Sequence, residues 1–216
     1  MKVLYIDCFG GFDTNMLLGA LIDMGASPVY TEQELISKGI EADIVSDRVR
    51  RSGIDAVFAY TRCVRNENSE DKKIENMCDA LGECDNDNIC LWSAVLCCIE
   101  CFGVEKIICS PIADGSGINH SGMPVPSVDV MEILKKYRIP VKTVDVGREL
   151  VSCEGAVFLG ENVDEFGMLP VGNIMCIGYG AGEENVDGCV NIVRCVLTET
   201  QDCDIFEKEI EMLFDI

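Results

Sequence analysis

Residues 110–127 hold the side chains best suited to acid–base or ligand chemistry, in the order SPIADGSGINHSGMPVPS. The segment contains the only histidine of the chain, His120, and Asp114, Ser116 and Gly117 precede it. An imidazole can give or take a proton near neutral pH, so His120 is a candidate catalytic residue that would orient or protonate a phosphate. The alternative, which stays open, is a loop histidine whose ring is satisfied by a backbone carbonyl.

A second candidate lies at the end of the first predicted strand, where Asp7 is followed by the turn Gly10-Gly11 and a helix. A carboxylate at this place suits a catalytic group or a metal ligand, and glycine allows the backbone to approach a phosphate closely. The turn lacks the spacing of a P-loop or of a dinucleotide fingerprint. A structural role for Asp7, at a strand end or as a cap, therefore remains the competing interpretation.

Both segments stand between a predicted strand and a predicted helix. Residues 104–109 form the apolar strand that leads into the 110–127 loop, and a helix over residues 127–137 leads out of it. In α/β proteins ligands bind where strands end and helices begin, because a helix N-terminus offers unpaired N–H groups. We expect the Asp7 turn and the 110–127 loop to converge on one cleft.

The surrounding pattern predicts an α/β fold with a mixed β-sheet covered by helices, in a single compact domain. Residues 1–62 form its strand, helix and hairpin part, residues 63–88 a polar and mobile connection with at most a short helix over 72–81, and residues 89–216 the remainder. Other predicted elements are a hairpin of strands 43–50 and 54–61, a helix over 88–102, a strand over 141–146, strands 173–177 and 191–197 around a glycine turn at 178–182, and a final helix over 204–214.

The formal net charge of −21 excludes two classes of partner. Nucleic acid and anionic membrane surfaces would both repel such a chain. No apolar run approaches the roughly 20 residues that span a bilayer. The first residues meet a charge too early for a signal peptide, so we expect a cytoplasmic protein.

Fourteen cysteines are present, most of them within apolar runs. A free cysteine in such a run behaves as a small apolar residue. A disulfide framework is not expected in a chain of this size without an export signal. Cys98 and Cys101 form a C-x2-C pair without a second half, so the indication of a structural zinc site is weak.

Three groups of motifs together resemble the N-terminal part of the LarC-type nickel insertion proteins. None of them is specific alone, but their order and spacing fit that family over most of the chain. They are LYIDCFGG with MLLGAL at residues 4–11 and 16–21, SP with GSG and HSGMPVP at residues 110–111, 115–117 and 120–126, and IGYGAG at residues 177–182.

The resemblance implies a nickel chelatase. Members of that family insert nickel into a pyridinium bis-thiocarboxylate mononucleotide, the precursor of a nickel-pincer cofactor, with CTP and a divalent metal such as magnesium or manganese. The candidate site residues that follow are His120 and Asp7 for catalysis, Asp7, Asp87 and Asp114 for the divalent metal, and Gly10, Gly11, Ser116, Gly117, Glu154 and Gly155 for the nucleotide.

Departures from the family keep other readings open. Residues 81–88 stand where the family has a histidine-rich stretch, a His-Glu pair and a Gly-Ala-Val-Asp-Ser-type motif, and of these only the aspartate is retained, as Asp87. Ser152-Cys153-Glu154-Gly155 replaces a Thr-Pro-Thr-Gly turn. The family's C-terminal domain has no counterpart in these residues. The alternatives to an enzyme are a non-catalytic subunit or degenerate homologue that serves a partner carrying that domain, and a metallochaperone using exposed cysteines. The expected partners are a nucleotide, the pincer-cofactor precursor, and either a second copy or a separate C-terminal-domain protein.

Overall fold

The computed structural model describes residues 1–66 and 71–200, so the helix predicted over residues 204–214 lies outside the described part. A seven-stranded mixed sheet runs through the centre in the order β2-β3-β10-β11-β1-β4-β9. Its strands are β1 (Lys2–Asp7), β2 (Ile40–Arg51), β3 (Ile54–Asn66), β4 (Lys106–Cys109), β9 (Glu165–Phe166), β10 (Asn173–Ala181) and β11 (Ile192–Glu199). The predicted mixed sheet is thereby confirmed.

The middle strand, β1, shows how the sheet separates its two faces. It pairs in parallel with β4 and antiparallel with β11. Because side chains alternate along a strand, Leu4 and Ile6 point into the main core, whereas Val3 and Tyr5 join a small cluster on the other face. Asp7 continues the second series, so its carboxylate lies on the side of the sheet away from the main core.

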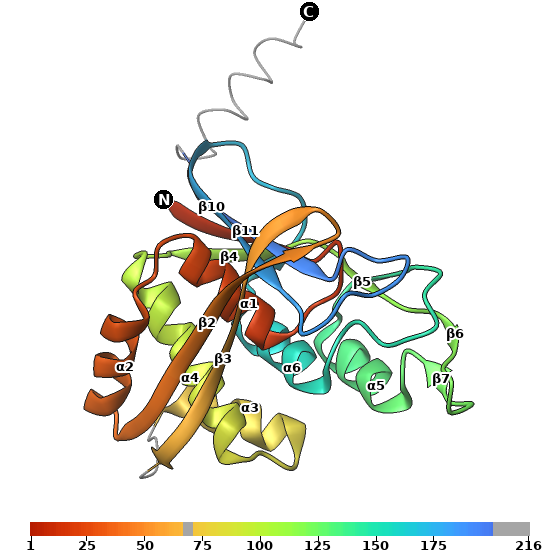
Figure 1. The fold of residues 1–216 in the computed structure, drawn as a ribbon, viewed down its shortest axis with the longest axis horizontal. Helices are drawn as coiled ribbons and strands as arrows, with labels where there is room; N and C mark the ends of the chain where they lie inside the picture. Colours follow the sequence, from red (N-terminus) through yellow and green to blue (C-terminus); the bar gives the residue numbers. More distant parts are fainter. Residues whose placement is uncertain (67–70, 201–216) are drawn as a thin grey trace, which may run out of the picture.

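The helices cover the core face of the sheet. They are α1 (Thr14–Asp23), α2 (Pro28–Ser37), α3 (Lys72–Leu81), α4 (Asn86–Cys101), α5 (Val128–Tyr137) and α6 (Cys153–Asn162). Figure 1 shows α2 to α6 in a row beneath the strands labelled β10, β11 and β4. The most enclosed is α4, whose residues Cys90 to Ile99 are all buried, as its apolar sequence predicts. The predicted single compact α/β domain is confirmed.

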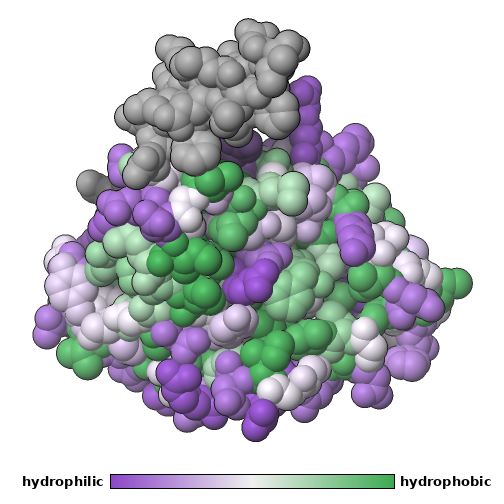
Figure 2. All heavy atoms as spheres, turned by 90° about the horizontal axis from the view of Figure 1, so that it is seen from above, coloured by the Kyte–Doolittle hydropathy of each residue, from purple (hydrophilic) through white to green (hydrophobic). Residues whose placement is uncertain are grey.

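The opposite face of the sheet is partly open among the described residues. Met175 and Ile177 alternate along β10 with Gly178 and Gly180, which face α1, and their side chains are exposed by 48% and 42%. Figure 2, which views the molecule from above, shows apolar groups scattered among hydrophilic ones. Among residues 1–66 and 71–200, no helix combines the length and the apolar character needed to cross a membrane.

Two small sheets shape the 110–127 loop. Strand β5 (Ile112–Asp114) pairs with β8 (Val141–Thr143), and β6 (Gly117–Ile118) pairs with β7 (Pro124–Val125). The predicted strand over residues 141–146 is therefore shorter than expected, because Val144 and Val146 turn back toward the loop. Their carbonyls accept hydrogen bonds from the hydroxyl and the backbone N–H of Ser116, at 2.8 and 3.0 Å.

The predicted glycine turn at residues 178–182 is wrong. Gly178 and Gly180 lie inside β10, and the connection to β11 follows them. A Cβ on Gly178 would lie 2.1 Å from the carbonyl oxygen of Ala20, and one on Gly180 would lie 1.6 Å from that of Met16. These glycines are needed because helix α1 rests with its backbone against the strand.

The predicted connection over residues 63–88 contains more regular structure than its polar composition suggests. Strand β3 extends to Asn66, and the predicted short helix is present as α3. Helix α3 buries Ile74 and Met77, which packs it onto the domain. Helix α4 begins at Asn86, two residues before the predicted start at residue 88, and is capped by Asp85.

The cysteines are free thiols throughout the described residues. Burial raises the pKa of Cys98 to about 12 and that of Cys153 to about 11, so both are protonated thiols near neutral pH. We therefore expect a thiol reagent to label few cysteines of the native protein near neutral pH, Cys101 first because it is exposed. In denaturant all fourteen should react.

The same thiols should become reactive as the pH is raised. A raised pKa means that the thiolate of Cys153 becomes substantial only as the pH approaches about 11. Mass spectrometry after brief alkylation at several pH values would follow each site. Rapid labelling of the buried thiols near neutral pH in the folded protein would contradict this expectation.

Candidate functional site

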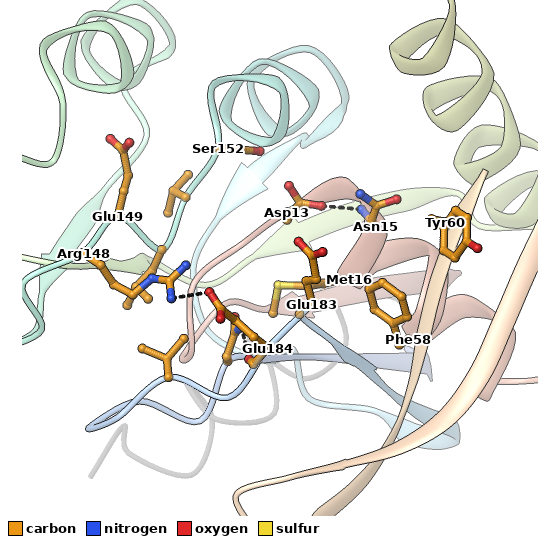
Figure 3. Close-up of a pocket in the computed structure, with 15 residues that line it drawn as sticks. Asp13, Asn15, Met16, Phe58, Tyr60, Arg148, Glu149, Ser152, Glu183 and Glu184 are labelled. Carbon is orange, nitrogen blue, oxygen red and sulfur yellow. Dashed lines mark hydrogen bonds and ion pairs between the residues drawn. The ribbon is translucent and has the colours of Figure 1, made fainter. Parts of the chain in front are cut away.

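A cavity of about 700 Å³, called here the first cavity, lies where the β1–α1 turn meets the segment before α6. Four parts of the chain line it, as Figure 3 shows. They are the start of α1 (Asp13, Asn15, Met16), the middle of β3 (Phe58, Tyr60), the segment before α6 (Arg148, Glu149, Leu150, Val151, Ser152) and the β10–β11 connection (Gly182, Glu183, Glu184, Val186, Asn191).

Two helix N-termini are brought side by side at this cavity. The backbone N–H of Phe12 donates to the carbonyl of Leu150 at 2.9 Å, and the N–H of Ser152 donates to the carbonyl of Phe12 at 3.3 Å. Asp13 caps α1 by accepting from the N–H of Asn15, and Ser152 caps α6 in the same way. The first-turn N–H groups of both helices give this wall of the cavity a positive potential.

The glycines of the first turn make this approach possible. A Cβ on Gly11, which has φ +100°, would lie 2.4 Å from the carbonyl oxygen of Leu150. A Cβ on Gly10 would lie 2.9 Å from the carbonyl oxygen of Ile192. Neither glycine lines the cavity, and both serve the close contact between the turn and its neighbours. Their predicted contact with a nucleotide stays a prediction.

The wall opposite the helix N-termini is aromatic, whereas the rim of the cavity carries charged side chains. Phe58 and Tyr60, on β3, have ring centroids 5.8 Å apart and form an aromatic wall. Among the described residues that line the cavity, acidic side chains predominate, and Arg148 is the one basic residue. Its Nη1 lies 2.6 Å from Oε1 of Glu184. The cavity can therefore hold a ligand with an anionic end and a flat, cationic or metal-bearing part.

A second, open cavity of about 380 Å³ adjoins the first. Arg148 and Glu149 line both, and the second is otherwise lined by Gly147 and by the β6–β7 tip, including His120. The side chain of Asn119 holds this tip, because its Oδ1 accepts from the N–H groups of Ser121 and Met123, both at 3.0 Å. Gly117 precedes the tip with φ +93°.

Asp7 and His120 are not gathered in one cavity. Asp7 lines neither cavity, and its carboxylate pairs with Arg194 on the far side of the sheet. The Phe9 ring lies 5.8 Å from the guanidinium carbon of Arg194 and covers the pair. The β1–α1 turn and the 110–127 loop nevertheless contact each other directly, because the N–H of Cys8 donates to Ser110 Oγ at 2.9 Å and the N–H of Ala113 donates to the carbonyl of Cys8 at 3.0 Å.

Asp114 and Asp87 lie in other elements than Asp7, at the end of β5 and in α4. Asp114 is fully buried, and its Oδ1 accepts from the N–H groups of Gly115 and Leu150 at 2.8 and 2.7 Å. Burial raises the pKa of its carboxyl, and the backbone N–H groups partly offset that rise. Asp87 lies in the first turn of α4. Among the described residues no group of three or more His, Cys, Asp or Glu side chains could hold a metal ion.

Glu154 and Gly155 lie in the first turn of α6, beside the first cavity. The N–H of Gly155 donates to Ser152 Oγ at 3.0 Å. Arg148, Phe58 and Tyr60 were not predicted. Phe58 and Tyr60 are two residues apart in a predicted strand, so the sequence already placed their side chains on one face of it. No feature of the sequence around Arg148 indicated that it would line a cavity.

Comparison with known proteins confirms the resemblance drawn from the motifs. The family model described as "Nickel insertion protein" matches residues 4–86 and 81–213. Proteins named "Pyridinium-3,5-bisthiocarboxylic acid mononucleotide nickel insertion protein" are 27% identical in Acetivibrio thermocellus, over 99% of this chain and 64% of the relative, and 28% identical in Thermotoga petrophila, over 89% and 60%. The relative of that name in Staphylococcus epidermidis is 28% identical over 93% and 60%.

The chain thus spans between 60% and 64% of the length of these relatives. No solved structure matches it. The family match nevertheless covers most of the chain, including the β1–α1 turn, the 110–127 loop and the glycines of β10. The chain belongs to the nickel insertion protein family.

Proposed function

We propose that this chain is the part of a nickel insertion system that binds pyridinium-3,5-bisthiocarboxylic acid mononucleotide, and that the ligand binds in the first cavity. The identity of this ligand comes from the name of the relatives, which includes the mononucleotide. The observation that carries the proposal is the cavity itself, which combines two adjacent helix N-termini, an aromatic wall and an acidic rim.

Each part of the ligand has a matching wall. The phosphate suits the N-termini of α1 and α6, where backbone N–H groups and helix dipoles favour an anion. The N-ribosyl pyridinium ring is permanently positive, so it suits the faces of Phe58 and Tyr60. Nickel is the cargo of the reaction, and carboxylates such as Asp13 and Glu183 at the rim would attract a dication before the ligand's sulfur atoms receive it.

CTP and magnesium or manganese, which the resemblance implies, form the finer part of this proposal. Because the described residues offer no group of three or more metal-ligating side chains, the divalent ion would bind together with the phosphates of the nucleotide. Calorimetric titration of the chain with CTP and magnesium chloride would test this part. Heat from binding with magnesium present, and none without it, is the expected result.

A protein partner is a further part of this proposal, because the resemblance implies one. We propose that a second copy of the chain or a separate protein takes part in the activity. We place this assembly in the cytoplasm. Light scattering of the chain alone, and then with the candidate partner, would distinguish the two arrangements.

The aromatic wall gives the sharpest test of the binding site. We expect Tyr60→Ala to weaken binding of nicotinic acid mononucleotide, a stable pyridinium mononucleotide, by about fivefold, as one cation–π contact of about 1 kcal/mol implies. Tyr60 is 38% exposed, so the variant should fold normally. Calorimetry measures the affinity.

The matched control is Tyr30→Ala on α2, which removes a 50% exposed tyrosine that does not line the cavity. Its affinity should equal that of the unmodified chain. If the unmodified chain, Tyr60→Ala and Tyr30→Ala bound the ligand with equal affinity, Tyr60 would not contact the ligand. A complete lack of binding at millimolar ligand, also with the natural mononucleotide, would overturn the proposed function.

A further inference from the structure

Arg148 and Glu184 face each other across the first cavity. Arg148 belongs to the segment before α6 and Glu184 to the β10–β11 connection, and Figure 3 shows the ion pair joining these two sides. Of the cavity-lining residues in the described part of the chain, Arg148 alone has a basic side chain that can neutralise an anion directly. In this structure its guanidinium is already occupied by a carboxylate.

The backbones behind both side chains are held firmly. A Cβ on Gly115 would lie 1.9 Å from the carbonyl oxygen of Arg148, so that carbonyl packs against the loop. On the other side, Asn191 Nδ2 donates to the carbonyl of Glu184 at 2.8 Å, and Arg51 Nη2 donates to that of Glu183 at 2.7 Å. The pair therefore joins two fixed walls, and its side chains can exchange partners without moving either wall.

The pair itself is exchangeable. The two side chains are 48% and 62% exposed, and ion pairs in such surroundings contribute little to stability. A phosphate monoester offers a guanidinium more charge than one carboxylate does, and it can accept two parallel N–H bonds. A phosphate entering the cavity would compete well for Arg148.

We propose that Arg148 recognises the phosphate of the ligand and that Glu184 holds its guanidinium until the phosphate displaces it. The pair then determines specificity. The phosphate of a nucleotide forms hydrogen bonds with the guanidinium of Arg148, whereas the corresponding nucleoside leaves Arg148 paired with Glu184 and forms no such contact. This inference rests on the proposed function, because it assumes that the ligand binds in the first cavity.

Glu184 acts in this scheme as a competitor built into the site. Removing its charge should free Arg148 and strengthen binding of phosphorylated ligands alone. Removing Arg148 should remove most of the preference for the phosphate and leave the affinity for the nucleoside unchanged. Glu183, the neighbouring carboxylate on the same cavity wall, is not paired with Arg148 and measures the general effect of removing a negative charge.

The test uses calorimetry of the full chain with nicotinic acid mononucleotide and with nicotinic acid riboside. The unmodified chain should bind the nucleotide at least tenfold more tightly. Arg148→Gln should reduce that ratio to about twofold, since the helix N-termini remain. Glu184→Gln should tighten nucleotide binding three- to fivefold more than Glu183→Gln does, without affecting the riboside. Thermal melting checks that each variant is folded.

Three outcomes would overturn the inference. Equal affinity of the unmodified chain for nucleotide and riboside would do so while leaving the proposed function intact. An unchanged preference in Arg148→Gln, or equal effects of Glu184→Gln and Glu183→Gln, would also leave the binding site in place but remove the role of the pair. If neither compound binds, the proposed function fails, and the inference fails with it.

Discussion

Gly180→Ala is expected to destabilise the domain by about 3 kcal/mol or more, because overpacking against backbone atoms has few ways to relax. A Cβ at this position would lie 1.6 Å from the carbonyl oxygen of Met16 and 2.6 Å from the N atom of Ala20. Helix α1 would have to move away from β10, and Asp13 and Asn15 of the cavity would move with it. Urea unfolding followed by circular dichroism measures the loss.

Gly167→Ala is the matched control for this substitution. Its added Cβ would meet nothing closer than 3.7 Å, and the residue does not require a left-handed backbone. We expect its free energy of unfolding to stay within about 0.5 kcal/mol of the unmodified chain. If Gly180→Ala were equally mild, the backbone contact between α1 and β10 would not limit stability.

The same glycine shows why one element was predicted wrongly. Glycine is needed either where the chain turns or where two backbones touch, and a single sequence does not say which. Gly178 and Gly180 are two residues apart, which places both on one face of a strand. That spacing was therefore also compatible with a strand whose glycine face packs against a helix, which is the arrangement of β10 and α1 in the structure. The apolar patterns of β1, β4 and α4 allowed no such ambiguity, and those elements were predicted correctly.

The candidate site was predictable only where local pattern determines it. The sequence offers Asp13 or Thr14 as a cap before an apolar helix, and in the structure Asp13 is the cap. The contact of Phe12 with Leu150 joins two distant segments, so the pairing of the two helix N-termini could not be predicted. The side on which Asp7 lies follows from strand alternation once Leu4 and Ile6 are assigned to the main core.

Asp114→Ala is expected to destabilise the domain by about 2–4 kcal/mol, since it leaves two buried N–H groups without their acceptor. The side chain is fully buried, and Oδ1 accepts from Gly115 and Leu150. The penalty for burying a carboxylate offsets part of the gain, which is why the expected loss is not larger. Leu150 in turn accepts from Phe12 at the start of α1. Affinity for nicotinic acid mononucleotide should therefore fall as well.

Two further variants separate this role from the loss of a charge. Asp145→Ala removes an exposed aspartate from the same stretch of chain and should leave both stability and affinity unchanged. Asp114→Asn keeps an oxygen that can accept from both N–H groups, so it should lose less stability than Asp114→Ala. If Asp114→Ala changed stability and affinity as little as Asp145→Ala, then Asp114 would not be needed to hold the segment before α6 in place. Because Asp114 lines neither cavity, a fall in affinity would show that the position of the segment before α6 controls ligand binding.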